Sequence, residues 1–323
     1  MPLAPSRLRA FALLALVVGA WGCNWPVTKL LVETVPPLWV TALRCWIAFG
    51  AVLAMLAASG ALIRPPAGDW PALLGTALLH MVGFSTLSAA GLAVLPASQA
   101  IVLGYTTPLW VALAAPLALG ETMRPGHRLG VGLGLLGLAV LLNPVAVDWA
   151  RPGIAGGIGL VLAASLCWAA NILLIRSRPW TARPFQLLVW QLLLAACVLT
   201  GLAVAVEGAP RFAWTGRIGL LLAFGGLVGT ALGYWAMSVV NRSLPALATA
   251  LGLTATPLVG IVCAGLVLGD PLTLPLVIAA TLIVGGIAAS SVAGRGRVPG
   301  AGRAIRHGVP QEGAPRPERS RPG

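Results

Sequence analysis

A few polar side chains lie inside otherwise apolar stretches, and these residues are the candidates for chemistry. Trp21 and Asn24 recur as Trp168 and Asn171, about 147 residues later. An amide or indole N–H among apolar residues must find a hydrogen-bond partner, and a ligand can provide one. The spacing therefore favours a cavity that binds a small molecule. The same amides could instead join neighbouring helices, where each contributes about 1 kcal/mol.

Arg44 and Lys29 are the two cations inside apolar stretches. A charge surrounded by hydrocarbon is costly, so its presence favours a functional role. Arg44 lies near the middle of its stretch, where it could attract the carboxylate of a substrate. Lys29 lies near the end of its stretch, where its long side chain could reach the membrane surface. Glu121 and Asp270 close two other stretches, and this position favours a structural role over the transfer of a coupling proton.

Four more side chains could line the same pocket. Of these, Tyr234 and Trp235 follow a ladder of small residues, Gly225, Gly229 and Gly233, which allows helices to approach closely. Packing is the alternative role for each of the four. The predicted substrate-binding residues are Trp21, Asn24, Arg44, Gln99, Tyr105, Trp168, Asn171, Tyr234 and Trp235.

The sequence predicts neither catalytic residues nor a metal site. The cysteines lie in apolar stretches without CxxC spacing and fit small buried packing residues. They are Cys23, Cys45, Cys167, Cys197 and Cys263. His80 stands alone in its stretch, and no cluster of His, Cys and carboxylates has the spacing of a metal site. The sequence contains no evident serine-nucleophile arrangement or phosphate-binding loop either, so an enzyme is disfavoured and no cofactor is expected.

The elements that position these residues are predicted to be membrane-spanning helices. The chain is 58% hydrophobic and 9% charged, whereas a soluble domain averages about 25% charged residues. Its apolar runs of about 20 residues match the thickness of a bilayer, and lipid requires each run to satisfy its own backbone hydrogen bonds. Ten spans are predicted at Phe11–Leu31, Leu38–Ala58, Trp70–Val94, Ala97–Leu119, Leu129–Leu142, Ile154–Ile175, Phe185–Val206, Ile218–Val240, Ala246–Leu268 and Leu272–Val292. The fifth is short and could begin nearer Pro125.

The basic residues indicate orientation rather than nucleic-acid binding. The net charge is +13, but most of the 21 Lys and Arg residues fall at span ends or in the tail. They collect on one side of the spans, which predicts that both termini are cytoplasmic. Arg7 and Arg9 before an apolar run also fit a signal peptide, but bulky Trp21 near the cleavage position favours an uncleaved span. Arg295–Gly323 is rich in Arg, Pro and Gly and is predicted to be a disordered tail.

The chain contains an internal repeat. Leu95–Glu121 aligns without a gap with Leu244–Asp270, five spans later. An odd offset means that the copies cross the membrane in opposite directions, as in many transporters. Pro108 and Pro257 hold the same position in the two copies, so paired bends and hinges are expected there. The predicted fold is an all-α integral membrane protein with ten transmembrane helices. Inverted five-helix repeats at 1–145 and 150–293 surround a central cavity, and a basic cytoplasmic tail follows at 294–323.

Together these features resemble the EamA type of the drug/metabolite transporter superfamily, over nearly the whole chain up to about Ala293. The motifs that carry the resemblance are Trp21–Gly22–Cys23–Asn24 with Lys29, Arg44, Leu95–Pro96–Ala97, Thr107–Pro108–Leu109 and Leu119–Gly120–Glu121, with the second-half copies. The resemblance implies transport, chiefly export, of amino acids and other small metabolites across the inner membrane. Asp270 stands where the family usually has Glu, and Leu173 does not repeat Pro26.

We therefore expect a secondary transporter that exports amino acids or similar metabolites by alternating access. Its partners are a small-molecule substrate and membrane lipids, and no nucleic acid is expected. The alternative is an integral-membrane interaction or regulatory protein that keeps the fold without transport, which only the basic tail motivates.

Overall fold

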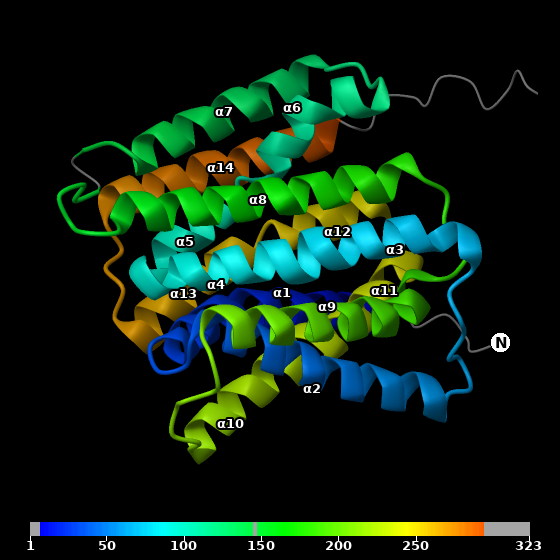
Figure 1. Cartoon of the computed structure of the whole chain (residues 1–323). Coiled ribbons are helices and arrows are strands. Elements are labelled where there is room, and N and C mark those ends of the chain that lie inside the picture. The colour runs from blue at the N-terminus through cyan, green and yellow to red at the C-terminus, as the bar shows by residue number, and fades with distance from the viewer. Residues whose placement is uncertain (1–6, 145–146, 294–323) are drawn as a thin grey trace, which may run out of the picture.

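The protein is described by a computed structural model that covers residues 7–144 and 147–293, and the predicted disordered tail lies outside these residues. All regular elements within the described ranges are helical (Figure 1). The first half contains α1 (Arg7–Val32), α2 (Pro37–Ala58), η1 (Ala67–Asp69), α3 (Trp70–Thr76), η2 (Ala77–Phe84), α4 (Ser85–Val94), α5 (Ala97–Gly104), α6 (Thr107–Leu119) and α7 (Pro125–Leu141). The second half contains α8 (Ile154–Ser177), α9 (Pro184–Val206), α10 (Gly216–Ala223), η3 (Phe224–Leu232), α11 (Gly233–Ser243), α12 (Ala246–Leu253), α13 (Thr256–Leu268) and α14 (Leu274–Ala293).

These elements confirm the predicted membrane spans. Nine helical stretches within the described ranges are long and apolar enough to cross a bilayer, and α7 is a shorter apolar tenth. The fifth span begins at Pro125 rather than Leu129 and ends at Leu141. Proline fits the first turn of a helix because that turn does not need its N–H. The eighth span begins at Gly216, where the Thr215 hydroxyl accepts a hydrogen bond from the Ile218 N–H at 3.2 Å.

The fourth and ninth spans are broken in their middles, as the paired prolines predict. In the fourth span, α5 ends at Gly104 and α6 begins at Thr107, one residue before Pro108. In the ninth span, α12 ends at Leu253 and α13 begins at Thr256, one residue before Pro257. Proline lacks an N–H and clashes with the carbonyl four residues earlier, which explains why both helices stop there. Whether the two breaks act as hinges stays a prediction.

The fourth and ninth spans run in opposite directions. The Ser98 N–H, in the first turn of α5, donates to the Asp270 carboxylate at 2.8 Å. Asp270 follows the last residues of α13, so the start of one span meets the end of the other. This contact confirms that the two copies of the repeat are inverted.

The two halves interleave rather than forming separate bundles. Helix α1 packs on α11 and α13 of the second half, and α8 packs on α4 and α6 of the first half. A Cβ atom on Gly22 would lie 3.0 Å from the Gly260 nitrogen, and one on Gly91 would lie 3.0 Å from the Gly157 oxygen. Glycine at these positions therefore lets backbones from different halves touch. The boundaries at 145 and 150 stay a prediction.

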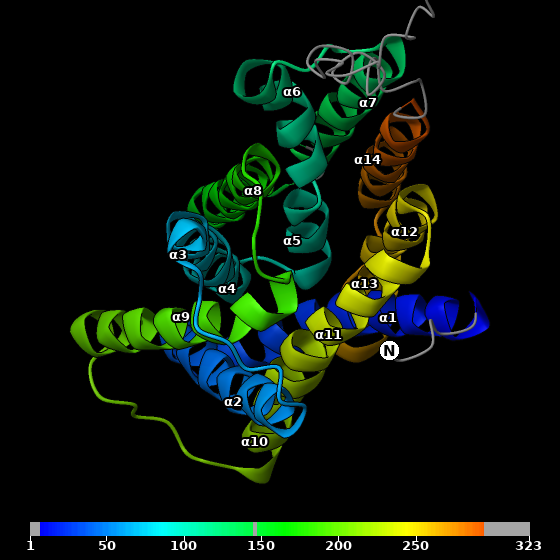
Figure 2. The ribbon, with the colours of Figure 1, turned by 90° about the vertical axis from the view of Figure 1, so that its right-hand side faces the viewer.

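The remaining spans pair with their own counterparts. Helix α2 packs on α9, and α7 packs on α14, as Figures 1 and 2 show from two directions. A Cβ atom on Gly286 would lie 2.6 Å from the Gly130 oxygen, so α7 and α14 approach at a backbone-to-backbone distance. The packing of α1 and α8 places the first span of each half against the third and fourth spans of the other half. The candidate residues lie at these contacts.

Candidate functional site

Polar side chains from α1 and α2 form one wall of the candidate site. Asn24 and Thr28 are four residues apart, so they share a face of α1. Arg44 of α2 donates from Nη1 to the Thr28 hydroxyl at 2.9 Å and from Nη2 to the Asn24 Oδ1 at 3.1 Å. Trp21, on the same face one turn earlier, donates from Nε1 to the Gly229 carbonyl at 3.1 Å. We call Trp21, Asn24, Thr28 and Arg44 the polar wall.

The glycine ladder of the eighth span holds this wall from the other half. A Cβ atom on Gly225 would lie 2.6 Å from Arg44 Nε, and one on Gly229 would lie 2.8 Å from Asn24 Oδ1. A Cβ atom on Gly233 would lie 2.7 Å from Trp21 Nε1. Each glycine thus makes room for one polar atom, which is a more specific role than the close helix contact expected from the sequence.

Stacked rings form a second wall, which we call the aromatic wall and define as His80, Phe84, Tyr105 and Trp168. The His80 ring stacks on Trp168, with centroids 5.7 Å apart and planes at 19°. It also stacks on Phe84 at 5.5 Å and 29°. Tyr105 meets the edge of Trp168 at 6.3 Å. Tyr105 lies directly after α5, in the break of the fourth span.

Tyr234 connects the two walls. Its hydroxyl lies 3.1 Å from His80 Nδ1, and its ring lies 5.7 Å from that of Trp21. Trp21, Asn24, Arg44 and His80 are only half-buried, although they lie between the two halves of the molecule. A small molecule in contact with these side chains would receive hydrogen bonds from one wall and stack on the other.

Both third spans carry a π-helical segment at corresponding positions. Segment η2 covers Ala77–Phe84, and η3 covers Phe224–Leu232, about 149 residues later. Such segments are rare and occur frequently at functional sites. His80 lies in η2, whereas Gly225 and Gly229 lie in η3. Neither these segments nor the ring contacts of His80 and Phe84 were predicted from the sequence. For His80, the available signal in the sequence was a lone histidine in an apolar span.

Three predicted site residues are not joined to either wall. Gln99 on α5 and Trp235 on α11 are half-buried, and within the described residues neither makes a side-chain hydrogen bond or ring contact to the walls. Asn171 on α8 is buried, and its Oδ1 has no hydrogen-bond partner in the described part of the chain. The structure therefore brings together Trp21, Asn24, Arg44, Tyr105, Trp168 and Tyr234 but not Gln99, Trp235 and Asn171, and substrate binding stays a prediction for all nine residues.

The charged residues at the span ends make structural contacts. Glu121 forms an ion pair with Arg176, the second-half counterpart of Lys29. Lys29 itself donates to the Leu92 carbonyl at 2.8 Å near the end of α4. Asp270, the counterpart of Glu121, holds the Ser98 N–H. These contacts agree with the structural role expected for both acids.

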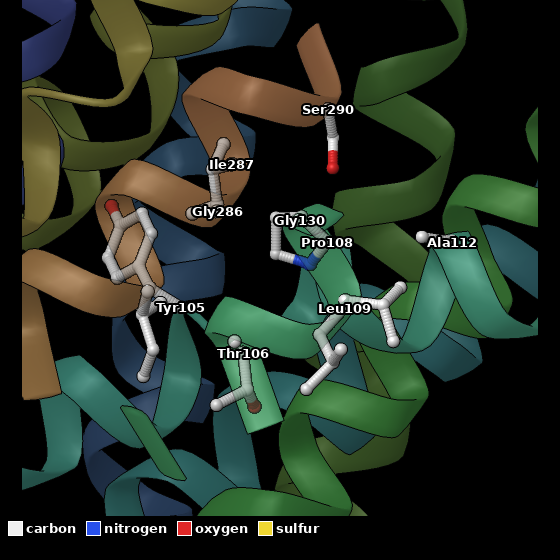
Figure 3. A pocket seen from close by; sticks show the side chains of 12 residues that line it. Tyr105, Thr106, Pro108, Leu109, Ala112, Gly130, Gly286, Ile287 and Ser290 are labelled. Carbon is white, nitrogen blue, oxygen red and sulfur yellow. The ribbon is translucent and has the colours of Figure 1, made fainter. Parts of the chain in front are cut away.

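A small pocket lies behind the break of the fourth span. Pro108, Thr106 and Leu109 line one side, and residues of α7 and α14 such as Gly130 and Ser290 line the other (Figure 3). Its volume of about 20 Å³ has room for one water molecule. It is too small for a metabolite, so it is a packing defect beside Pro108 rather than the candidate site. Within the described residues, no group of three or more His, Cys, Asp or Glu side chains could hold a metal ion.

Comparison with known proteins gives a consistent result along the chain. Residues 8–143 and 155–292 match the EamA-like transporter family. The chain is 28% identical over 284 residues to the uncharacterized transporter YvbV of Bacillus subtilis, covering 86% of this chain and 90% of that protein. It is 26% identical over 285 residues to a probable amino-acid metabolite efflux pump of Escherichia coli, covering 84% and 91%. A crystal structure of a protein that is 22% identical overlays with a TM-score of 0.62, covers 89% of this chain and 98% of that one, and shares the fold.

Proposed function

The chain belongs to the EamA-like transporter family and is a multi-pass membrane transporter rather than an enzyme, and we propose that it exports amino acids or other small metabolites by alternating access. The inner (plasma) membrane is the proposed location, with both termini in the cytoplasm. The excess of Arg and Lys on the side of the N-terminus supports this orientation. The name of the Escherichia coli relative, "probable amino-acid metabolite efflux pump", supports both the direction and the substrate type.

One observation carries the proposal: side chains of both halves meet between inverted repeats. Trp21 of the first half contacts Tyr234 of the second, and His80 of the first half contacts Trp168 of the second. A site made at the interface of inverted repeats can open to either side of the membrane when one half moves against the other. The paired breaks before Pro108 and Pro257 interrupt one span in each half, which supports hinges at these two positions.

Transport in purified liposomes tests the proposal. The protein, reconstituted into liposomes loaded with labelled amino acids and related metabolites, is expected to release at least one of them without ATP. Empty liposomes and the Asn24→Leu variant are the controls, because leucine removes the oxygen that Arg44 Nη2 contacts. If a folded native protein releases no member of a broad panel faster than empty liposomes do, the proposed function is wrong.

A further inference from the structure

The guanidinium of Arg44 carries a charge in a predicted membrane span, and no acidic side chain of the described residues pairs with it. It donates to two neutral oxygens, those of Thr28 and Asn24, and its buried Nε has no partner among the described residues. A guanidinium has five N–H donors, so several remain for a ligand. An uncompensated charge away from water is strongly unfavourable, and a bound anion relieves that cost.

The acidic residues of the described chain all lie away from the two walls. They are Glu33, Asp69, Glu121, Asp148, Glu207 and Asp270. Each lies outside or at the end of a predicted span, and several are already used. Glu207 accepts the N–H groups of Leu38 and Trp39 at 3.0 and 3.1 Å, and Asp69 accepts those of Thr181 and Ala182 at 3.0 and 2.9 Å. The site therefore offers a ligand one positive charge and no carboxylate for an ammonium group.

On the other side of the site from Arg44, the aromatic wall favours ligands that contain a planar ring. The His80 ring stacks on those of Trp168 and Phe84, and the Tyr105 ring meets that of Trp168 in an edge contact with 74° between the planes. Tyr234 links this surface to the polar wall through Trp21. Aromatic surfaces of this kind favour a flat ring, because offset and edge contacts between rings add to the burial of apolar area.

We propose that the site binds a small carboxylate anion that carries a planar ring and lacks an ammonium group. The carboxylate lies against Arg44, and the ring lies against the aromatic wall. This inference rests on the proposed transport function and names its substrate class. A matching amino acid fits less well because its ammonium group lies next to its carboxylate and is therefore repelled by Arg44, and no carboxylate of the described residues at the walls offsets this repulsion.

Calorimetric binding to the full chain in lipid nanodiscs tests the substrate class without relying on flux. The probes are 3-phenyllactate, phenylalanine and phenethylamine, which share a ring and differ in charge, and 3-cyclohexyllactate, which lacks the planar ring. We expect phenyllactate to bind at least about ten-fold more tightly than phenylalanine, and phenethylamine to bind most weakly. Cyclohexyllactate is expected to bind about three- to ten-fold more weakly than phenyllactate.

A substituted pair separates the role of Arg44 from general charge effects. Arg44→Gln, which gives α2 the residue that α9 carries at the corresponding Gln191, is expected to remove the preference for phenyllactate over phenylalanine. Arg217→Gln makes the same change at an exposed residue and is expected to keep the preference. Arg44→Lys keeps the charge and is expected to keep the preference at reduced affinity.

The results distinguish this inference from the proposed function. If phenylalanine binds the native protein as tightly as phenyllactate, or if none of the four probes binds, the substrate class is wrong. Flux of another metabolite in the liposome assay would then leave the transporter function intact. If Arg44→Gln keeps the full preference for phenyllactate, Arg44 does not hold the carboxylate and the inference is overturned.

Discussion

The third spans of the two halves both contain a π-helical segment, but the first half supplies aromatic rings there and the second half supplies glycines. The 149-residue offset that aligns Leu95 with Leu244 places His80 opposite Gly229 and Phe84 opposite Gly233. In the first half, these positions carry rings that lie against Trp168. In the second half, they carry glycines that make room for Asn24 and Trp21. At corresponding positions of the inverted repeat, one half therefore carries large aromatic side chains and the other carries glycines that leave room for side chains of the first half.

The second spans of the two halves differ in the charge of a corresponding side chain, whereas the third spans differ in the size of corresponding side chains. Helices α2 and α9 begin at Pro37 and Pro184, so Arg44 and Gln191 occupy the same register. Arg44 donates a hydrogen bond to Asn24, whereas the corresponding pair, Gln191 and Asn171, forms no such bond among the described residues. The charge of the polar wall therefore has no counterpart at the corresponding position of the second half.

The largest expected effect comes from filling the space that the second half leaves. Gly229→Val places a side chain where even a Cβ atom lies 2.8 Å from Asn24 Oδ1. Overpacking of this kind costs about 1–3 kcal/mol, which corresponds to a factor of about 5 to 150, so we expect transport in liposomes to fall at least about five-fold. Gly219→Val is the matched control, because nothing lies within 4 Å of a Cβ atom there. Equal transport by the two variants would contradict the role given to the glycine ladder.

The next effect comes from removing bulk on the aromatic wall. Trp168→Leu deletes the stacking partner of His80, Phe84 and Tyr105. Ring pairs contribute about 0.5–1.5 kcal/mol each, so the Kd of the transported ligand is expected to rise about three- to ten-fold or more. Trp214→Leu, at an exposed tryptophan that contacts Phe212, is the control for loss of an indole. An unchanged Kd in the Trp168→Leu variant would separate the aromatic wall from ligand binding.

A smaller effect is expected from the support of Arg44. Thr28→Val keeps the shape of the side chain and removes the hydroxyl that accepts from Arg44 Nη1 at 2.9 Å. A hydrogen bond to a charged group contributes about 1.5–3 kcal/mol, although partial exposure of Arg44 reduces this toward about 1 kcal/mol. We expect a lower melting temperature in detergent and weaker ligand binding. A variant with native melting and native affinity would show that Thr28 does not hold the guanidinium.

The smallest effects are expected at the span ends, where the halves again differ. Glu121 and Arg176 form an ion pair in which both side chains are 44% exposed. Exposed pairs contribute little, so Glu121→Gln is expected to change stability by less than about 0.5 kcal/mol. Asp270→Asn weakens a charge-assisted hydrogen bond to the first turn of α5, so this variant is expected to lose about 1 kcal/mol of stability. Melting curves of the two variants compare them, and a larger loss for Glu121→Gln would contradict this ranking.

The sequence predicted the spans, the repeat and the broken helices because these depend on local properties. Span length follows from hydropathy, and the breaks follow from the missing N–H of Pro108 and Pro257. Trp21, Asn24 and Arg44 could be chosen because polar groups inside apolar spans need partners. His80 and Phe84 were missed because their contacts with Trp168 join different halves, and spacing along one helix does not record such contacts. The π-helical segments were missed because no simple residue pattern specifies them.

The central claim is that the two halves are inverted around a common site, and thiol labelling from one side of the membrane tests it most directly. Thr122 and Thr273 are exposed in the loops that follow the fourth and ninth spans. Each is changed to cysteine in a protein whose native cysteines, Cys23, Cys45, Cys167, Cys197 and Cys263, are replaced. A membrane-impermeant reagent applied to intact cells is expected to label Thr273→Cys at once and Thr122→Cys only after permeabilisation. Labelling of both variants from the same side would contradict the inverted arrangement and the transport site built on it.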